Sequence, residues 1–237
     1  MLSSIHGGMN GAATPRAPSA SVEDYLKAVW GLADDGAAST KEVADRLSVS
    51  AASVTNMFAR LDEMGLVEYE RYRGASLTEE GRERALSLVR RHRLIETFLL
   101  DRLGYSWEDV HEEAERLEHA VSDEFTERLA EMLGHPERDP HGDPIPAADG
   151  AMPPEESSPL STAEDDRRVV ISRVANEDAE VLSYLRERGL VLGRALHVKE
   201  IRALDGVIVV EDEDGASHTL GAPLARTILV REEAAED

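Results

Sequence analysis

Histidine and glutamate side chains with helical spacing are concentrated in residues 92–119. His92 and Glu96 are four residues apart, so on a helix they lie one above the other on a single face. A second predicted helix carries four further residues of these types on one face, namely His111, Glu115, Glu118 and His119. Facing helices with such pairs can build a metal site, and imidazole with carboxylate but no sulfur suits Mn²⁺, Fe²⁺, Co²⁺ or Zn²⁺. The alternative is that these side chains form solvated rows on the surface helices of a Glu-rich chain.

The composition narrows the chemistry that this chain can perform. Its 237 residues include no cysteine, which excludes disulfides, thiolate metal ligands and cysteine nucleophiles and is consistent with a reducing cytoplasm. No run of about 18 apolar residues exists, so no membrane span is expected. Residues 1–20 are rich in Gly, Ala, Ser and Pro, which predicts a disordered arm rather than a targeting peptide. No separate nucleophile or substrate-binding motif is present, so we expect neither an enzyme nor a small organic ligand.

The elements that must position the histidine and glutamate residues are mainly helical. Helical periodicity runs through residues 21–134 with one short β-like interruption. Within it, a helix over 22–32 precedes a helix over 41–47 and, after a tight break at Ser48-Val49-Ser50, a helix over 51–64. Two short helices joined by a tight turn form a helix-turn-helix outline.

A predicted hairpin follows this outline. Residues 66–70 and 75–77 alternate around Arg71-Tyr72-Arg73-Gly74, which gives the hairpin a basic tip, and Thr78 then opens another helix. A helix-turn-helix followed by a basic hairpin is the winged-helix layout. The alternative for the third helix is an amphipathic helix in an ordinary bundle.

The third helix of this layout would enter the major groove of DNA. Small residues at its start allow close approach to base edges, and they are Ser50, Ala51, Ala52, Ser53, Thr55 and Asn56. Arg60, Arg71 and Arg73 would neutralise phosphates. The net charge of −22 opposes nucleic-acid binding, but residues 41–100 hold ten Lys/Arg and ten Asp/Glu and are neutral as a group.

Residues 135–234 largely lack the helical periodicity of the preceding part of the chain. Seven prolines in residues 135–165 predict an extended linker. Residues 166–234 alternate apolar and polar side chains, as strands do, with a short helix over 179–188 and a hairpin turn at Asp214-Gly215. The strands are predicted at 169–171, 195–198, 207–210 and 227–230. A small barrel with one helix fits this pattern.

Four segments together resemble the DtxR family of metal-dependent repressors, most closely its manganese-responsive branch of actinobacterial type. These segments are residues 90–96, 110–115, 117–119 and 139–146. The resemblance spans residues 21–234. It implies a mainly α protein with a β module: a disordered arm at 1–20, a winged-helix domain at 21–80, a helical metal-binding and dimerisation domain at 81–134, a linker at 135–165 and an SH3-like barrel at 166–234. It also implies a cytoplasmic homodimer that binds double-stranded operator DNA and represses metal-homeostasis genes.

The resemblance implies two metal positions per subunit. One would use His92, Glu96 and His111. The other would use Asp24 together with Glu115, Glu118 and His119. Iron-responsive members typically place Met and Cys where Asp24 and Glu115 stand, and exchanging soft sulfur for hard oxygen favours Mn²⁺ over the alternative Fe²⁺. Zn²⁺ or Co²⁺ are expected to substitute in vitro.

The chain departs from the family pattern in the SH3-like domain and in the first helix. Arg173 and Asn176 stand where iron-responsive members lend a Glu and a Gln to the first metal, and an arginine cannot ligate a cation. Asn176, Glu177 or Asp178 remain candidates for that place. Lys27 replaces a Glu of some two-domain manganese members, which argues against a closely spaced binuclear site. Two rival functions stay open: an iron-responsive repressor of the same family and a metal-independent winged-helix regulator.

Overall fold

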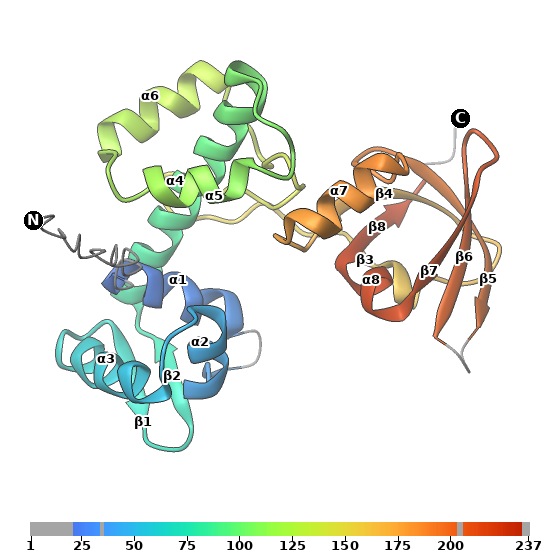
Figure 1. Cartoon of the computed structure of the whole chain (residues 1–237). Coiled ribbons are helices and arrows are strands. Elements are labelled where there is room, and N and C mark those ends of the chain that lie inside the picture. Colours follow the sequence, from blue (N-terminus) through green and yellow to red (C-terminus); the bar gives the residue numbers. More distant parts are fainter. Residues whose placement is uncertain (1–20, 34–35, 203–205, 234–237) are drawn as a thin grey trace, which may run out of the picture. The chain divides into compact units, whose positions relative to one another are not determined.

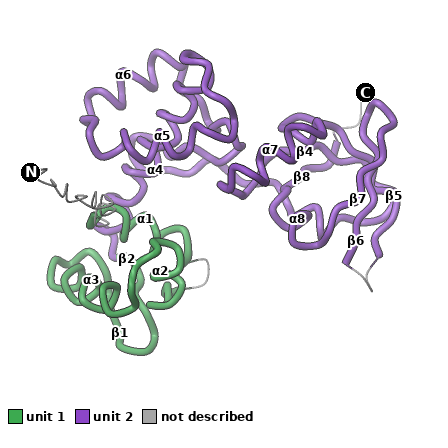
Figure 2. Tube along the Cα trace, viewed as in Figure 1, with its two compact units in different colours: residues 1–77 green, residues 78–237 purple. Residues whose placement is uncertain are grey.

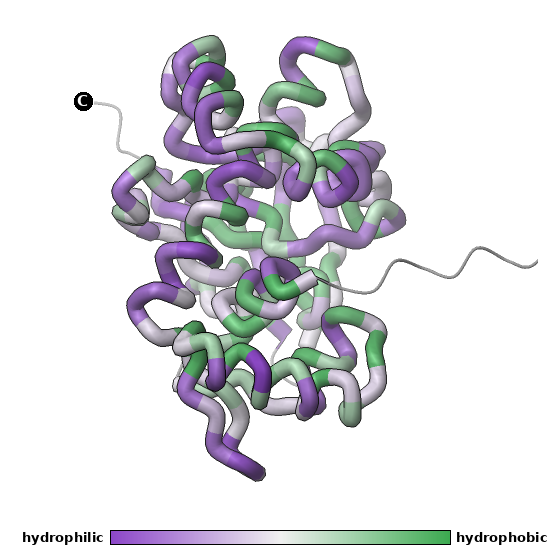
Figure 3. Tube along the Cα trace, turned by 90° about the vertical axis from the view of Figure 1, so that its left-hand side faces the viewer, coloured by the Kyte–Doolittle hydropathy of each residue, from purple (hydrophilic) through white to green (hydrophobic). Residues whose placement is uncertain are grey.

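The computed structural model describes residues 21–33, 36–202 and 206–233, so the arm predicted for residues 1–20 lies outside the described residues. The chain divides into two compact units, residues 1–77 and residues 78–237 (Figure 1; Figure 2). Hydrophilic stretches interrupt the hydrophobic ones throughout the chain (Figure 3). Among the described residues, no helix is long and apolar enough to cross a membrane.

The described residues of the first unit form three helices and a β-hairpin. Its elements are α1 (Val22–Leu32), α2 (Thr40–Arg46), α3 (Ala51–Glu63), β1 (Val67–Glu70) and β2 (Gly74–Leu77). Each helix begins after a serine whose hydroxyl accepts a hydrogen bond from the backbone N–H three residues later; these N-caps are Ser21, Ser39 and Ser50. Val29, Val54 and Phe58 are fully buried, and the three helices contact one another. The winged helix that the sequence predicts is therefore confirmed.

The wing is attached to the helices through its second strand. Strand β2 pairs antiparallel with β1, from Val67 opposite Leu77 to Glu70 opposite Gly74. Ala75 exchanges two backbone hydrogen bonds with Ala38, at 2.9 and 3.0 Å. Gly74 has a φ of +106°, and a Cβ added there would lie 2.2 Å from the Ala38 carbonyl oxygen. Only glycine therefore allows the wing to lie this close to the segment before α2.

The second unit begins with three helices. They are α4 (Glu79–Leu103), α5 (Val110–Leu117) and α6 (Asp123–Leu133). Helix α4 contacts both α5 and α6, and the three bury a core that includes Leu94, Leu99, Val110 and Leu129. The 25 residues of α4 make it the longest helix described, and it ends at Gly104 in the left-handed conformation.

The Pro-rich segment 135–165 differs from the extended linker that its composition predicts. Asp139, His141 and Ile145 are buried, and Ile145 belongs to the helical core. Residues 158–162 form β3 (Ser158–Pro159) and a 3₁₀ turn, η1 (Leu160–Thr162), which belong to the β module. Proline indicates extended backbone, but it carries no information on whether that backbone finds partners in the surrounding fold. The segment packs as part of the second unit.

The chain ends in a six-stranded antiparallel sheet with two short helices. The strand order is β3-β8-β4-β5-β6-β7. The remaining elements are β4 (Arg168–Val174), α7 (Ala179–Glu187), β5 (Ala195–Arg202), β6 (Val207–Asp212), β7 (Ser217–Gly221), α8 (Ala222–Thr227) and β8 (Ile228–Glu232). The hairpin turn at Asp214-Gly215 joins β6 to β7, as predicted. Helix α8 was not predicted, and Thr227, which was expected in a strand, is its last residue. A helix of six residues is too short to show periodicity.

Replacing Gly74 with alanine tests the attachment of the wing. Because the new Cβ would clash with the Ala38 backbone as well as strain a positive φ, we expect opening of residues 36–77 to become easier by about 3 kcal/mol. Hydrogen exchange of the full chain, followed on peptides from that region, measures this free energy.

Gly215→Ala is the matched control. Gly215 also has a positive φ, of +82°, but no atom lies within 4 Å of the added Cβ. Backbone strain alone is expected there, at a cost of about 1 kcal/mol. Equal effects at the two positions would contradict the close approach at Gly74.

Candidate metal centre

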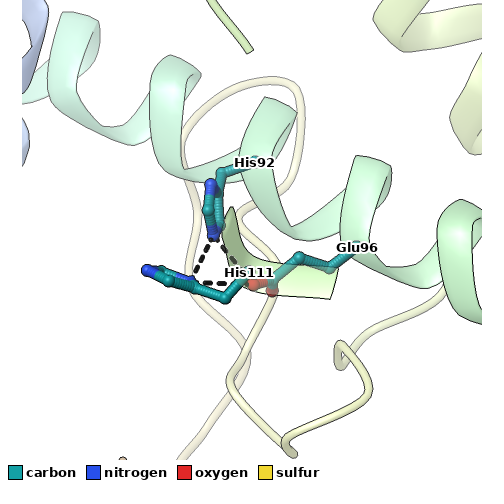
Figure 4. A group of neighbouring side chains, drawn as sticks. All are labelled: His92, Glu96 and His111. Carbon is teal, nitrogen blue, oxygen red and sulfur yellow. Dashed lines mark hydrogen bonds and ion pairs between the residues drawn. The ribbon is translucent and has the colours of Figure 1, made fainter. Parts of the chain in front are cut away.

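Two helices bring His92, Glu96 and His111 together. His92 and Glu96 lie one turn apart on α4, and His111 is the second residue of α5 (Figure 4). The His92 Nε2 atom is 2.9 Å from the Glu96 Oε1 atom and 3.1 Å from the His111 Nδ1 atom. The third side of this triangle, from His111 Nδ1 to Glu96 Oε1, is 3.1 Å. The structure thus assembles one of the two ligand sets that the family resemblance implies.

These three atoms fit a divalent cation. Ligands about 2.1 Å from one ion and at right angles to each other stand about 3.0 Å apart, which is the separation observed. His92 and Glu96 are only 5% and 2% exposed, so the group is shielded from competing water. Burial raises the pKa of the Glu96 carboxyl, but the charge on His92 and hydrogen bonds from His111 and His92 outweigh it. The pKa of Glu96 therefore lies well below its ordinary value, and the carboxylate is ready to ligate.

Glu118 determines which nitrogen of His92 faces this group. Its Oε2 atom makes a short hydrogen bond with the His92 Nδ1 atom. If a metal replaces the proton on Nε2, a proton held on Nδ1 leaves a lone pair on Nε2 toward the other two atoms. Three lone-pair donors would then converge on the bound cation.

The residues of the predicted second ligand set come from both units: Glu115, Glu118 and His119 belong to the second unit, and Asp24 belongs to the first. Helix α5 ends at Leu117, so Glu118 caps the helix and His119 lies in the following turn, not on the continuous helical face that the spacing predicts. The His119 Nε2 atom is 3.6 Å from Glu118 Oε1. The Glu115 Oε1 atom is 3.6 Å from His111 Nε2, so Glu115 borders the first group.

Asp24 belongs to the other unit, where it has a local structural role. Its carboxylate accepts a 2.6 Å hydrogen bond from the Ser21 backbone N–H and completes a capping box at the start of α1. Its predicted part in the second metal set stays a prediction.

A third group of metal-type side chains was not predicted. Glu96, Asp139 and His141 are all buried, and each offers an atom within 4.8 Å of the others. The His141 Nε2 atom is 3.0 Å from the Trp107 carbonyl oxygen, which directs Nδ1 toward Glu96 Oε2 at 3.9 Å. Burial, together with the negative charges of Asp143 and Glu96, raises the pKa of Asp139 well above its ordinary value. The run Asp139–Pro146 was noticed in the sequence, but helical periodicity could not connect it with Glu96.

Glu177, one of the three residues of the SH3-like module named as candidates for the first metal set, lies beside His111. Arg173 is turned to Asp143, with its Nη2 atom 2.7 Å from Oδ1. The Asn176 Oδ1 atom accepts a hydrogen bond from the Asp178 backbone N–H. Glu177 instead places its Oε2 atom 3.6 Å from the His111 Nε2 atom.

All nine residues predicted to contact DNA are exposed on the first unit. They are Ser50, Ala51, Ala52, Ser53, Thr55, Asn56 and Arg60 on and before α3, and Arg71 and Arg73 on the wing. Arg71 stacks on the ring of Tyr72, at 5.2 Å from its centroid, and Arg73 forms a 3.0 Å ion pair with Glu70. The Thr55 hydroxyl donates to the Ala51 carbonyl oxygen, so it is partly engaged within the helix.

A winged helix followed by a helical unit with a buried His/carboxylate group defines a metal-responsive DNA-binding regulator. Family models agree with each part: iron dependent repressor N-terminal DNA binding domain (residues 19–75), iron dependent repressor metal binding and dimerisation domain (78–147) and FeoA domain (158–232).

Individual relatives agree over most of the chain. The diphtheria toxin repressor of Corynebacterium glutamicum is 32% identical over 219 residues, which cover 88% of this chain and 94% of that protein. A solved manganese-dependent transcriptional repressor in complex with manganese is 41% identical, with a TM-score of 0.85 over 90% of this chain and all of that one. The iron-dependent repressor IdeR of Mycobacterium tuberculosis is 38% identical, but the chain spans only about half of its length, 54%. This chain belongs to the DtxR family of metal-dependent transcriptional repressors.

The buried group predicts that metal stabilises the second unit. At a free Mn²⁺ concentration of about 100 times the dissociation constant, one site adds about 2.7 kcal/mol to the free energy of unfolding. We expect His111→Ala to lose most of this gain, measured by denaturant unfolding with and without Mn²⁺.

His197→Gln is the control, because His197 is a histidine of β5 that pairs with Asp166 at the surface, and it should leave the gain unchanged. An unaltered gain in His111→Ala would show that the metal binds elsewhere.

Proposed function

We propose that this protein is a manganese-activated transcriptional repressor that controls metal-homeostasis genes. The observation that carries the proposal is the buried convergence of His92, Glu96 and His111, in a chain whose other unit presents an exposed recognition helix. The protein would act in the cytoplasm as a homodimer on double-stranded operator DNA. Exposed Phe125 and Met132 on α6 support self-association through the helical unit.

Manganese is favoured over iron by the chemistry of the donors. The proposed ligands are imidazole nitrogens and carboxylate oxygens, and the chain holds no cysteine. Hard oxygen donors reduce the advantage that softer ligands give to Fe²⁺ and the metals beyond it. The solved relative named as manganese-dependent supports this choice, whereas the relatives named as iron-dependent keep Fe²⁺ as the alternative.

The first proposed ligand set is His92, Glu96 and His111, to which Glu177 adds a nearby carboxylate. The second is Asp24 with Glu115, Glu118 and His119. Glu118 has one carboxylate oxygen on His92 and the other 3.6 Å from His119, so it would couple the two sets. This arrangement supports communication between the sites through a single side chain.

The proposed mechanism is a shift of population between two states of the dimer. When bound, the cation supplies positive charge that offsets the clustered carboxylates. Asp24, on the first helix of the winged-helix unit, would then ligate the same cation as Glu115. This would fix the spacing of the two recognition helices in the dimer. Such a shift requires that the DNA-competent state binds metal more tightly than the other state.

Operator binding should depend on Mn²⁺. After the protein is stripped with a chelator, we expect weak binding to a labelled promoter fragment and tight binding once micromolar Mn²⁺ is added, with Fe²⁺ weaker under anaerobic conditions. Fluorescence anisotropy at fixed salt measures this, because phosphate contacts make the affinity depend on salt. Glu115→Ala and His119→Ala should abolish the response while the protein stays folded. Equal binding with a chelator present would identify a metal-independent regulator.

Metal selectivity should follow the two positions that distinguish the branches. In the double variant Asp24→Met with Glu115→Cys, soft sulfur replaces hard oxygen, so we expect the order of activation to change from Mn²⁺ first to Fe²⁺ first. The measurement is the ratio of half-saturating Mn²⁺ and Fe²⁺ concentrations in the same DNA-binding assay. Asp24→Asn with Glu115→Gln keeps oxygen donors and serves as the control; it should weaken both metals without reversing their order.

A further inference from the structure

The loop of residues 139–144 lies against strand β4 with direct contact between backbones. The Val174 backbone N–H donates a 2.8 Å hydrogen bond to the His141 carbonyl oxygen. Gly142 has a φ of +86°, and a Cβ there would stand 2.2 Å from the Ser172 carbonyl oxygen. The helical part and the β module of the second unit are therefore joined at a place with no room for a side chain.

Two arginines from different elements meet on one carboxylate of this loop. Asp143 Oδ1 is 3.1 Å from an Nη atom of Arg93 on α4 and 2.7 Å from an Nη atom of Arg173 on β4. Arg93 also donates to the Pro144 carbonyl oxygen. All three charged side chains are partly or largely buried, where an ion pair is screened less than at the surface. Asp143 thus ties β4 to the helix that carries His92 and Glu96.

A bulge in β4 is what turns Arg173 toward Asp143. Val169 and Ile171 are buried in the core of the β module, and strict alternation would place residue 173 there as well. The register with β8 shifts between Ile171 and Arg173, so Val174 takes the core position instead. Bulges commonly redirect a side chain in this way.

Strand β4 leads directly to Glu177. Val174 is held by His141, the Ala175 N–H donates to the Thr227 carbonyl oxygen at 2.7 Å, and the Asn176 N–H donates to Val174 at 2.9 Å. Glu177 follows in the turn before α7, half exposed, with its carboxylate 3.6 Å from His111. Whether this carboxylate reaches His111 depends on where the end of β4 lies relative to α4 and α5.

We propose that Arg173 is a positioning residue of the metal centre: through Asp143 it holds the end of β4 so that Glu177 stands beside His111. The inference rests on the proposed function, because Glu177 faces the Nε2 atom of His111 and would support this histidine while its Nδ1 atom ligates the metal of the first set. Arg173 does not touch the metal group itself. Its guanidinium keeps the segment that carries Glu177 in place whether or not metal is bound.

Mn²⁺ binding to the full chain tests this role. Electron paramagnetic resonance measures the concentration of free Mn²⁺. The relevant binding sites are those that the His111→Ala variant lacks. We expect Arg173→Gln and Glu177→Gln each to weaken these sites about 10-fold or more, as loss of a supporting residue commonly does. The Mn²⁺ affinity of the double variant should be no lower than that of the single variant with the lower affinity. The reason is that both changes remove the same carboxylate from beside His111.

Two further variants separate positioning from general damage to the fold. Arg168→Gln removes an exposed arginine from the same strand and should bind Mn²⁺ like the unchanged protein. Arg173→Lys keeps the charge next to Asp143 and should recover part of the affinity. In metal-free protein, Arg173→Gln should increase hydrogen exchange at the Val174 amide, and Arg168→Gln should not.

The outcomes distinguish this inference from the proposed function. If the unchanged protein binds Mn²⁺ at these sites and Arg173→Gln binds equally well, or if the effects of Arg173→Gln and Glu177→Gln multiply, the positioning role is wrong and the function stands. If the unchanged protein has no sites that depend on His111, the proposed function fails and the positioning role fails with it.

Discussion

The buried carboxylate of Glu96 is the constraint on which the second unit depends. An ionised carboxylate that is 2% exposed must be compensated, because a charge buried without a partner costs several kcal/mol. Imidazoles approach it from α4, α5 and the loop before β3: His92 at 2.9 Å, His111 at 3.1 Å and His141 at 3.9 Å. The charge on His92 and the hydrogen bonds from His92 and His111 offset the carboxylate in this structure, and a bound divalent cation would take over that role. The need for positive charge at Glu96 thus links the fold of this unit to the proposed response to metal.

Helix α4 transmits this constraint to its surroundings. Besides His92 and Glu96, it carries Arg90, Arg91 and Arg93 within about one turn. Arg90 forms a two-pronged ion pair with Glu127 and Arg91 pairs with Asp123, both from α6, while Arg93 binds the loop that contains Asp143. A planar guanidinium fixes direction as well as distance, so these pairs set the orientation of α6 and the loop around α4. The metal group is therefore built on a rigid helix whose neighbours are held at several points.

The local spacing of apolar and capping residues predicted much of this arrangement. It could not predict contacts between segments that are distant in the sequence. The winged helix and α4 were predictable because capping serines and apolar spacing act within a few residues. His92, Glu96 and His111 were assigned through spacing and family resemblance. The contact of Glu118 with His92 and the burial of His141 depend on how α5 and the Pro-rich segment fold back on α4. Glu177 approaches the centre only because a bulge shifts the end of β4, and no sequence period encodes a bulge.

The strong acidity of the chain limits how metal can control DNA binding. Two divalent ions would offset only four of the 22 net negative charges, so the chain stays acidic when loaded. Charges at the surface are screened over about 8 Å at physiological ionic strength, which confines any direct effect of the ions to their neighbourhood. Residues 41–100 are neutral as a group whether or not metal is bound, so their own net charge does not oppose DNA. Control through bulk electrostatics is therefore too weak, and a switch in this protein has to act through geometry, by restricting where the recognition helices of a dimer can lie.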